Sequence, residues 1–119
     1  MGLDLTLCPE STHLSHWFLA YNRIRLNPDY ELYGRLGNGC DGEAIIGHPL
    51  PPGMRFDWYE EEGIKERTDD PYGSPLTYLT AGEIVKAIGS MKLTDPWNRG
   101  VVSFIRELPK DSMVVLWWH

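Results

Sequence analysis

The chain has few cysteines, which cross-link small proteins, and no long apolar run of the kind that anchors proteins in membranes. Its 119 residues include only two cysteines, Cys8 and Cys40, too few for a disulfide framework or a cysteine-based zinc site. No segment approaches the roughly 18 consecutive apolar residues needed to cross a bilayer. The stretch 1–4 lacks the basic start of a signal peptide. These absences predict a cytoplasmic protein with reduced cysteines and no membrane partner.

Positive charge is also scarce. The chain holds 11 Lys and Arg against 17 Asp and Glu, which gives a net charge of −6. The bases are scattered along the sequence and form no run. Nucleic-acid binding needs clustered Lys and Arg, because contacts to phosphates release condensed counterions. The sequence therefore predicts no direct binding to nucleic acid.

Recognisable catalytic and metal-binding signatures are missing. His13 and His16 have the spacing of metal ligands on a helical turn, but no further ligand follows at a matching spacing. The glycine-rich segment 37–42 lacks the Lys-Ser/Thr ending of a phosphate loop. No serine lies in a nucleophile-elbow context. We therefore expect no metal and no cofactor. These absences favour a non-enzymatic role but do not exclude an enzyme.

The apolar content is sufficient for a folded domain. Hydrophobic residues make up 42% of the chain and aromatic residues 12%, which argues against disorder. A chain of this length corresponds to about one domain. We expect a single domain over residues 1–119, in which the segment 37–70 is rich in loops and becomes acidic toward its end.

Hydrophobic periodicity predicts the α+β class. Alternating or continuous apolar runs indicate strands over 2–8, 17–26, 54–59 and 113–118, with a brief strand over 44–46. A capping box at Thr80 and Glu83 and the pair Asp95-Pro96 start two main helices, and Asp29 caps a short helix over 30–36. Because strands and helices are segregated along the chain, we expect a mixed or antiparallel sheet of about four strands, with the two main helices packed on one face.

An acidic stretch is the most distinctive feature of the surface. Between Asp57 and Asp70 the chain carries seven acids and two bases. One interpretation is a solvated loop or sheet edge. The other is a patch that meets a basic partner, including a nucleic-acid-binding protein whose ligand it imitates. The acids are Asp57, Glu60, Glu61, Glu62, Glu66, Asp69 and Asp70.

Two adjacent indoles extend this candidate partner-binding surface. Trp117 and Trp118 lie on one predicted strand and so point to opposite faces of the sheet. A helix, a long loop or another chain must cover the indole that does not face the main core. Exposed aromatic residues are typical of binding surfaces, so we predict that Trp117 and Trp118 join the acids in contacting a partner.

Polar residues at the ends of the predicted elements suggest an alternative site. If they converge, they form a pocket for a nucleotide or another anion; if they stay apart, they are caps and turn residues. A buried Asp4 would need a partner such as Arg23 or Arg99. The alternative pocket consists of Asp4, Arg23, Tyr72, Tyr78, Arg99 and His119.

Three segments of the chain resemble a family of small uncharacterised proteins encoded by tailed bacteriophages and prophages. These segments are residues 1–6, 70–78 and 98–119. This resemblance implies expression in the cytoplasm of a bacterial host, and it assigns no activity or functional residue. Together with the acidity, it predicts a non-enzymatic phage accessory protein that binds a host protein, for example an inhibitor of a CRISPR effector or a restriction enzyme. The alternatives are a small nucleotide-binding or anion-binding protein or enzyme, and a structural role. A homodimer is compatible with each.

Overall fold

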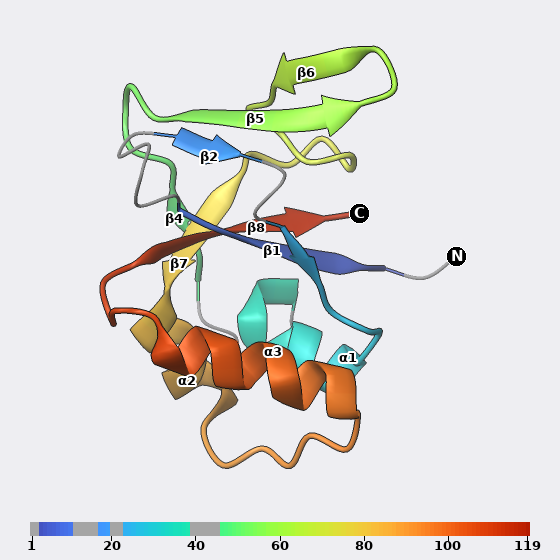
Figure 1. The fold of residues 1–119 in the computed structure, drawn as a ribbon, viewed down its shortest axis with the longest axis vertical. Helices are drawn as coiled ribbons and strands as arrows, with labels where there is room; N and C mark the ends of the chain where they lie inside the picture. The colour runs from blue at the N-terminus through green and yellow to red at the C-terminus, as the bar shows by residue number, and fades with distance from the viewer. Residues whose placement is uncertain (1–2, 11–16, 20–22, 39–45) are drawn as a thin grey trace.

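Three layers stack along the long axis of the molecule (Figure 1). The computed structural model describes residues 3–10, 17–19, 23–38 and 46–119. Over these residues the Cα radius of gyration is 13.6 Å and the extents are 37 × 33 × 26 Å. Helices form the first layer, a five-stranded sheet the second and a three-stranded sheet the third.

The five-stranded sheet is antiparallel throughout, in the order β3-β1-β8-β7-β4. Its central strand, β8, pairs with β1 from Leu5 opposite Trp118 to Pro9 opposite Val114. Because side chains alternate along a strand, this register sends Leu5 and Trp118 to one face and their neighbours to the other. The strands are β1 (Leu5–Pro9), β3 (Ile24–Arg25), β4 (His48–Pro49), β7 (Thr77–Thr80) and β8 (Met113–Trp118).

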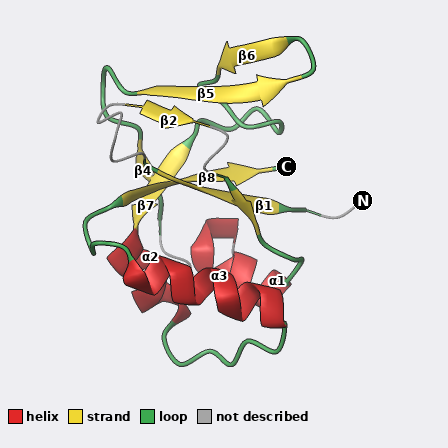
Figure 2. Ribbon diagram, in the orientation of Figure 1, coloured by secondary structure: helices red, strands yellow, loops and turns green. Residues whose placement is uncertain are grey.

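The helices cover one face of this sheet (Figure 2). Their apolar stripes bury Ile84, Ile88, Val101 and Ile105 against the strands in the larger of two hydrophobic clusters. This burial is the main favourable contribution to folding. The helical elements are α1 (Tyr30–Tyr33), η2 (Gly34–Asn38), α2 (Ala81–Ile88) and α3 (Pro96–Glu107).

The second sheet covers the opposite face, where a smaller cluster joins Cys8, Phe56, Leu76, Val115 and Trp117. Burial raises the pKa of the Cys8 thiol to about 12, so this cysteine is an apolar core residue rather than a reactive group. The second sheet has the order β2-β5-β6, with β2 parallel to β5 and β6 antiparallel to it. Its strands are β2 (Trp17–Leu19), β5 (Arg55–Glu60) and β6 (Gly63–Glu66).

The structure confirms the α+β class and the strongest local signals. The side chain of Thr80 accepts a hydrogen bond from the Glu83 N–H at the start of α2. Asp95 does the same for Asn98 at the start of α3, and Asp29 caps α1. The predicted C-terminal strand is present as β8.

Several predicted boundaries were wrong. The single strand expected over 17–26 is two strands, β2 and β3, which belong to different sheets. The main sheet has five strands, and a second sheet, which the sequence did not predict, covers its other face. Residues 63–66 form a strand where a loop was expected, and β7 was not predicted. Of the brief strand over 44–46, only Ile46 is described, and it is not in a strand.

Candidate functional site

The acidic stretch folds as a β-hairpin at the end of the molecule farthest from the helices (Figure 1). Strands β5 and β6 pair from Asp57 opposite Glu66 to Glu60 opposite Gly63. Glu61 and Glu62 make the two-residue turn. The strand predicted over 54–59 is present as β5, whereas the loop expected after it contains strand β6. Residues 55–66 are called the acidic hairpin below.

The hydrogen-bond register shows which backbone groups of β6 face outward. The N–H of Arg67 donates to the carbonyl of Phe56 at 2.8 Å. Bonded and non-bonded pairs alternate in an antiparallel ladder, so Lys65 bonds to β5 whereas the backbone groups of Ile64 and Glu66 point away from it. In the described part of the chain, no strand pairs with this outer edge. All four residues of β6 are exposed, and Ile64 is 51% exposed.

The acidic hairpin and the turn after it keep a net negative charge despite internal ion pairs. Residues 55–70 carry seven acids and three bases. Lys65 Nζ lies 2.7 Å from a Glu62 carboxylate oxygen and 3.5 Å from Glu60, and Arg67 also pairs with Glu60. Exposed pairs of this kind contribute at most about 1 kcal/mol each. They leave an excess of four negative charges on this end of the molecule.

Two of the predicted partner-binding acids are buried in the fold. Asp57 is 3% exposed and accepts a 2.7 Å hydrogen bond from Arg55 Nε. Asp70 is also buried, and its Oδ1 accepts from the N–H groups of Tyr72 and Ser74 at 2.9 and 3.1 Å. Both carboxylates satisfy groups of their own chain, which corrects the expectation that they face a partner. The acids that keep solvent contact are Glu60, Glu61, Glu62, Glu66 and Asp69.

The two adjacent indoles are not displayed as a joint surface. Trp117 is 5% exposed, and its ring stacks on Trp58 at a centroid distance of 4.2 Å. Trp118 is half-buried on the helical side, edge-on to Tyr33 at 5.6 Å. The opposite orientations follow from the strand geometry as predicted. The second sheet covers Trp117. The sequence had suggested a helix, a long loop or another chain as this cover, but not a second sheet.

A cleft of about 380 Å³ lies between the end of β8 and the acidic hairpin. It contains three carboxylates, and one of them, Glu60, pairs with Arg67. Beside it, the guanidinium of Arg23 lies 4.9 Å from the centre of the Trp58 ring, a cation–π contact. The residues that line the cleft are Trp58, Glu60, Arg67, Asp69, Asp70, Pro71, Trp117 and His119.

His119 forms a hydroxyl–imidazole pair with Thr6, whose Oγ1 lies 2.9 Å from its Nε2. Burial lowers the pKa of His119 below 6.5, and Arg25 and Arg23 lower it further against the charge of Asp4. The imidazole is therefore neutral at pH 7. A neutral imidazole beside a hydroxyl is the arrangement that activates a nucleophile. Thr6 is only 3% exposed, however, so its hydroxyl is closed to a substrate, and the pair joins β1 to the residue that follows β8.

The six residues of the alternative pocket do not converge. Asp4 and His119 exchange backbone hydrogen bonds, but the carboxylate of Asp4 pairs with Arg25 at 3.2 Å rather than with Arg23 or Arg99. Arg99 donates to Leu93 and Thr94 carbonyls at the start of α3, on the far side of the main sheet from His119. The two tyrosines also lie apart: Tyr78 packs on His48 at a centroid distance of 5.1 Å, and Tyr72 is exposed in its turn.

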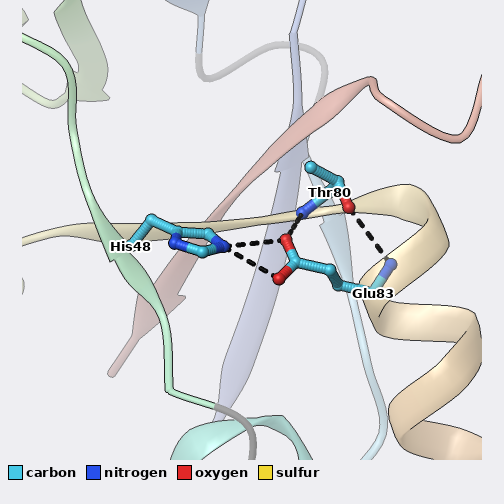
Figure 3. A network of polar contacts seen from close by, with 3 residues as sticks. All are labelled: His48, Thr80 and Glu83. Carbon is cyan, nitrogen blue, oxygen red and sulfur yellow. Dashed lines mark hydrogen bonds and ion pairs between the residues drawn. The ribbon is translucent and has the colours of Figure 1, made fainter.

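A polar network between β4 and α2 was missed by sequence reasoning (Figure 3). His48 Nε2 lies 2.8 and 3.0 Å from the two carboxylate oxygens of Glu83. The same carboxylate accepts from the Thr80 N–H at 2.9 Å. Burial raises the pKa of Glu83, but hydrogen bonds from Thr80 and His48 outweigh it and hold this pKa below 4.5. The capping box was readable from spacing, whereas His48 is 35 residues away in sequence.

This network predicts an acid-sensitive contribution to stability. Because the folded-state pKa of Glu83 is lowered, its ionised form stabilises the fold above about pH 4.5, and this contribution is lost as the pH falls through the lowered value. We expect Glu83→Gln to cost about 0.5–1 kcal/mol at pH 7 and less at pH 3, as measured by urea unfolding. The control is Glu107→Gln, an exposed site on α3. An equal cost of Glu83→Gln at both pH values would contradict this role.

Neither metal-binding nor membrane-spanning features are found in the described ranges. No group of three or more His, Cys, Asp or Glu side chains there is placed to hold a metal ion. No helix in the same ranges has the length and apolar character to traverse a bilayer. His13, His16 and Cys40 lie outside the described residues.

Comparison of the chain with family profiles, curated proteins and solved structures gave no match.

Proposed function

We propose that this chain is a non-enzymatic binding protein, encoded by a bacteriophage or prophage, that attaches to a host protein in the bacterial cytoplasm. The observation that carries the proposal is the exposed outer edge of β6, whose Ile64 and Glu66 backbone groups point away from the fold beside an excess of acids. Few native proteins leave such an edge open, because it is a template for another strand.

Edge and charge act together in the proposed contact. A strand of the partner adds to β6 through main-chain hydrogen bonds, the mode known as β-augmentation. The flanking Glu61 and Glu62 attract a basic partner surface and disfavour acidic ones. A protein that binds nucleic acid offers such a surface, since it is built to meet phosphates. A CRISPR effector or a restriction enzyme is therefore a suitable partner, and occupation of its nucleic-acid site would inhibit it.

Binding of a nucleotide or another small anion is less well supported. The cleft beside Trp58 holds three carboxylates, and Arg67 is already paired with Glu60. An anion entering it would meet like charge, which disfavours binding. Arg99, which was expected to contribute, is held on the other side of the main sheet.

Capture from bacterial lysate with matched variants tests the proposal. Ile64→Pro removes an outward N–H and blocks the edge, and proline is tolerated where the N–H faces solvent. Glu61→Lys/Glu62→Lys reverses the charge of the turn. The control, Glu107→Lys/Asp111→Lys, makes the same charge change at exposed positions on the helical side. Wild type and control are expected to retain one host protein that both hairpin variants lose, and duplex DNA added to the lysate is expected to displace it.

Thermal unfolding followed by circular dichroism separates lost binding from lost folding. Each variant is expected to unfold within a few degrees of wild type, because surface changes usually alter stability by no more than about 0.5 kcal/mol. Capture that persists in both folded hairpin variants would overturn the proposal, as would loss of capture in the control alone.

A further inference from the structure

A pocket of about 290 Å³ lies between α2 and α3 and is called the basic pocket below. Its floor is apolar: Ala81 and Ile105 are buried, and Val85 and Leu108 are partly buried against the main core. Exposed bases from α2, from α3 and from the turn after α3 surround this floor, and no carboxylate of the described residues lines it. The three bases are Lys86, Arg106 and Lys110.

These bases differ from most others in the chain, because their side chains have no partner among the described residues. Seven of the eleven bases make ion pairs, a cation–π contact or hydrogen bonds through their side chains. Of the four that make none within the described ranges, three line the basic pocket, and the fourth, Lys92, lies outside it. The seven engaged bases are Arg23, Arg25, Arg35, Arg55, Lys65, Arg67 and Arg99.

The positive charge gathered here contrasts with the net charge of −6 of the whole chain. Like charges around one pocket repel one another, and the nearby acids Glu107 and Asp111 do not line it. Lys86 and Arg106 lie in the last turns of their helices, where a base interacts favourably with the helix dipole. Lys110 lies beyond the end of α3, so helix stability does not account for the whole cluster.

Backbone packing brings Lys110 to the basic pocket. The N–H of Gly82 donates to the carbonyl of Lys110 at 2.9 Å, and a Cβ on Gly82 would lie only 3.1 Å from that oxygen. The glycine therefore lets the segment after α3 approach the first turn of α2. The N–H of Ala81 is likewise used, by the carbonyl of Ser112 at 2.8 Å. These backbone donors are occupied, so the positive charge of the basic pocket comes from its side chains.

We propose that the basic pocket binds a small amphiphilic anion, a short alkyl chain that ends in a carboxylate. The alkyl chain covers the apolar floor, and the carboxylate meets the three bases and relieves their repulsion. The volume is at the lower end of the range for small-molecule sites, about 300–1,000 Å³, which limits the ligand to a short chain. The cleft beside Trp58 has the opposite charge, so the anion selects the basic pocket.

The inference goes beyond the proposed function and does not depend on it. In Figure 1, α2 and α3 form the layer farthest from the acidic hairpin. A ligand in the basic pocket therefore leaves the outer edge of β6 open, and the two sites are tested separately.

Isothermal titration calorimetry of the full chain at low ionic strength tests the ligand class, with octanoate as the probe. The expected Kd is below about 1 mM. Hexanoate is expected to bind about tenfold more weakly, because each buried methylene accounts for a factor of about three to four. Octylammonium has the same alkyl chain with the opposite charge, and no binding is expected up to about 10 mM.

Matched lysine variants test the site. Lys86→Gln and Lys110→Gln are each expected to weaken octanoate binding at least about threefold, because each removes a charge that attracts the carboxylate. Lys92→Gln removes the base outside the basic pocket and is expected to bind octanoate as wild type does. Each variant is expected to unfold thermally within a few degrees of wild type, because all three positions are exposed.

Three results would contradict the proposal. One is a wild type that does not bind octanoate at concentrations up to about 10 mM. Another is octylammonium binding as tightly as octanoate, or Lys92→Gln losing as much affinity as the two pocket variants. The third is an apolar acidic peptide that binds where octanoate does not, which would make the basic pocket a docking site for a protein segment.

Discussion

Replacement of Trp117 by alanine is expected to lower the free energy of unfolding by about 3–5 kcal/mol, the range for removing a large aromatic side chain from a core. Trp117 is 5% exposed and lies between the two sheets, with its ring 4.2 Å from Trp58 and 5.6 Å from Phe56. Its removal opens a cavity that these rings cannot fill from their own strand. Urea unfolding followed by far-ultraviolet circular dichroism measures the loss.

Two further variants show whether the position of Trp117 matters. Trp117→Phe keeps a ring against Trp58 and is expected to cost less than half as much as the alanine change. Ile46→Ala removes apolar atoms at an exposed site and is expected to change stability by no more than about 0.5 kcal/mol. A cost of Trp117→Ala no larger than that of Ile46→Ala would show that the second sheet does not pack on β8.

Replacement of Asn98 by alanine is expected to cost about 2–3 kcal/mol. Asn98 is fully buried; its Oδ1 accepts from the Asn27 N–H at 2.8 Å, and its Nδ2 donates to the Asn27 carbonyl at 3.0 Å. Alanine removes both hydrogen bonds, each worth about 0.5–1.5 kcal/mol, and leaves a cavity where the buried amide of Asn98 packed. The two bonds tie the segment after β3 to the first turn of α3. Urea unfolding at neutral pH again measures the effect.

Asn27→Ala is the matched control for this prediction. It removes only an exposed hydrogen bond from Asn27 Nδ2 to Asp95 and keeps the backbone groups that Asn98 satisfies. We expect a cost of at most about 1 kcal/mol. If Asn98→Ala cost no more than Asn27→Ala, water would be satisfying the Asn27 backbone and the buried bridge would not hold α3.

The parts of the fold that the sequence predicted depend on neighbouring residues. Thr80 and Glu83 are three apart and satisfy each other's N–H groups, so the start of α2 was readable without the rest of the chain. Asp95 and Pro96 marked the start of α3 for the same reason. The apolar run of β8 showed that this strand is buried.

The parts that were missed depend on pairing between distant residues. Strand β6 is exposed along its whole length, so it has no alternation of apolar and polar residues and its charges favoured a loop. Its identity as a strand comes from its pairing with β5. The covering of Trp117 by the second sheet likewise depends on where β5 lies, which periodicity does not reveal.

The candidate site was predicted only in part for the same reason. The sequence located the acids, and five of the seven keep contact with solvent. It did not show that the carboxylate of Asp57 accepts a hydrogen bond from Arg55, or that the carboxylate of Asp70 accepts hydrogen bonds from backbone N–H groups. The open edge of β6 follows from the register of the acidic hairpin, so it could be recognised only once the strands were placed.

Amide hydrogen exchange of the captured complex is the most direct test of attachment through β6. In the free protein the outward N–H groups of Ile64 and Glu66 are exposed and should exchange within seconds, whereas that of Lys65 is bonded to β5. On binding of the host protein, exchange at Ile64 and Glu66 is expected to slow by about tenfold or more, because a partner strand now accepts these hydrogen bonds. Unchanged exchange at both positions, with protection elsewhere on the surface, would contradict attachment through this edge.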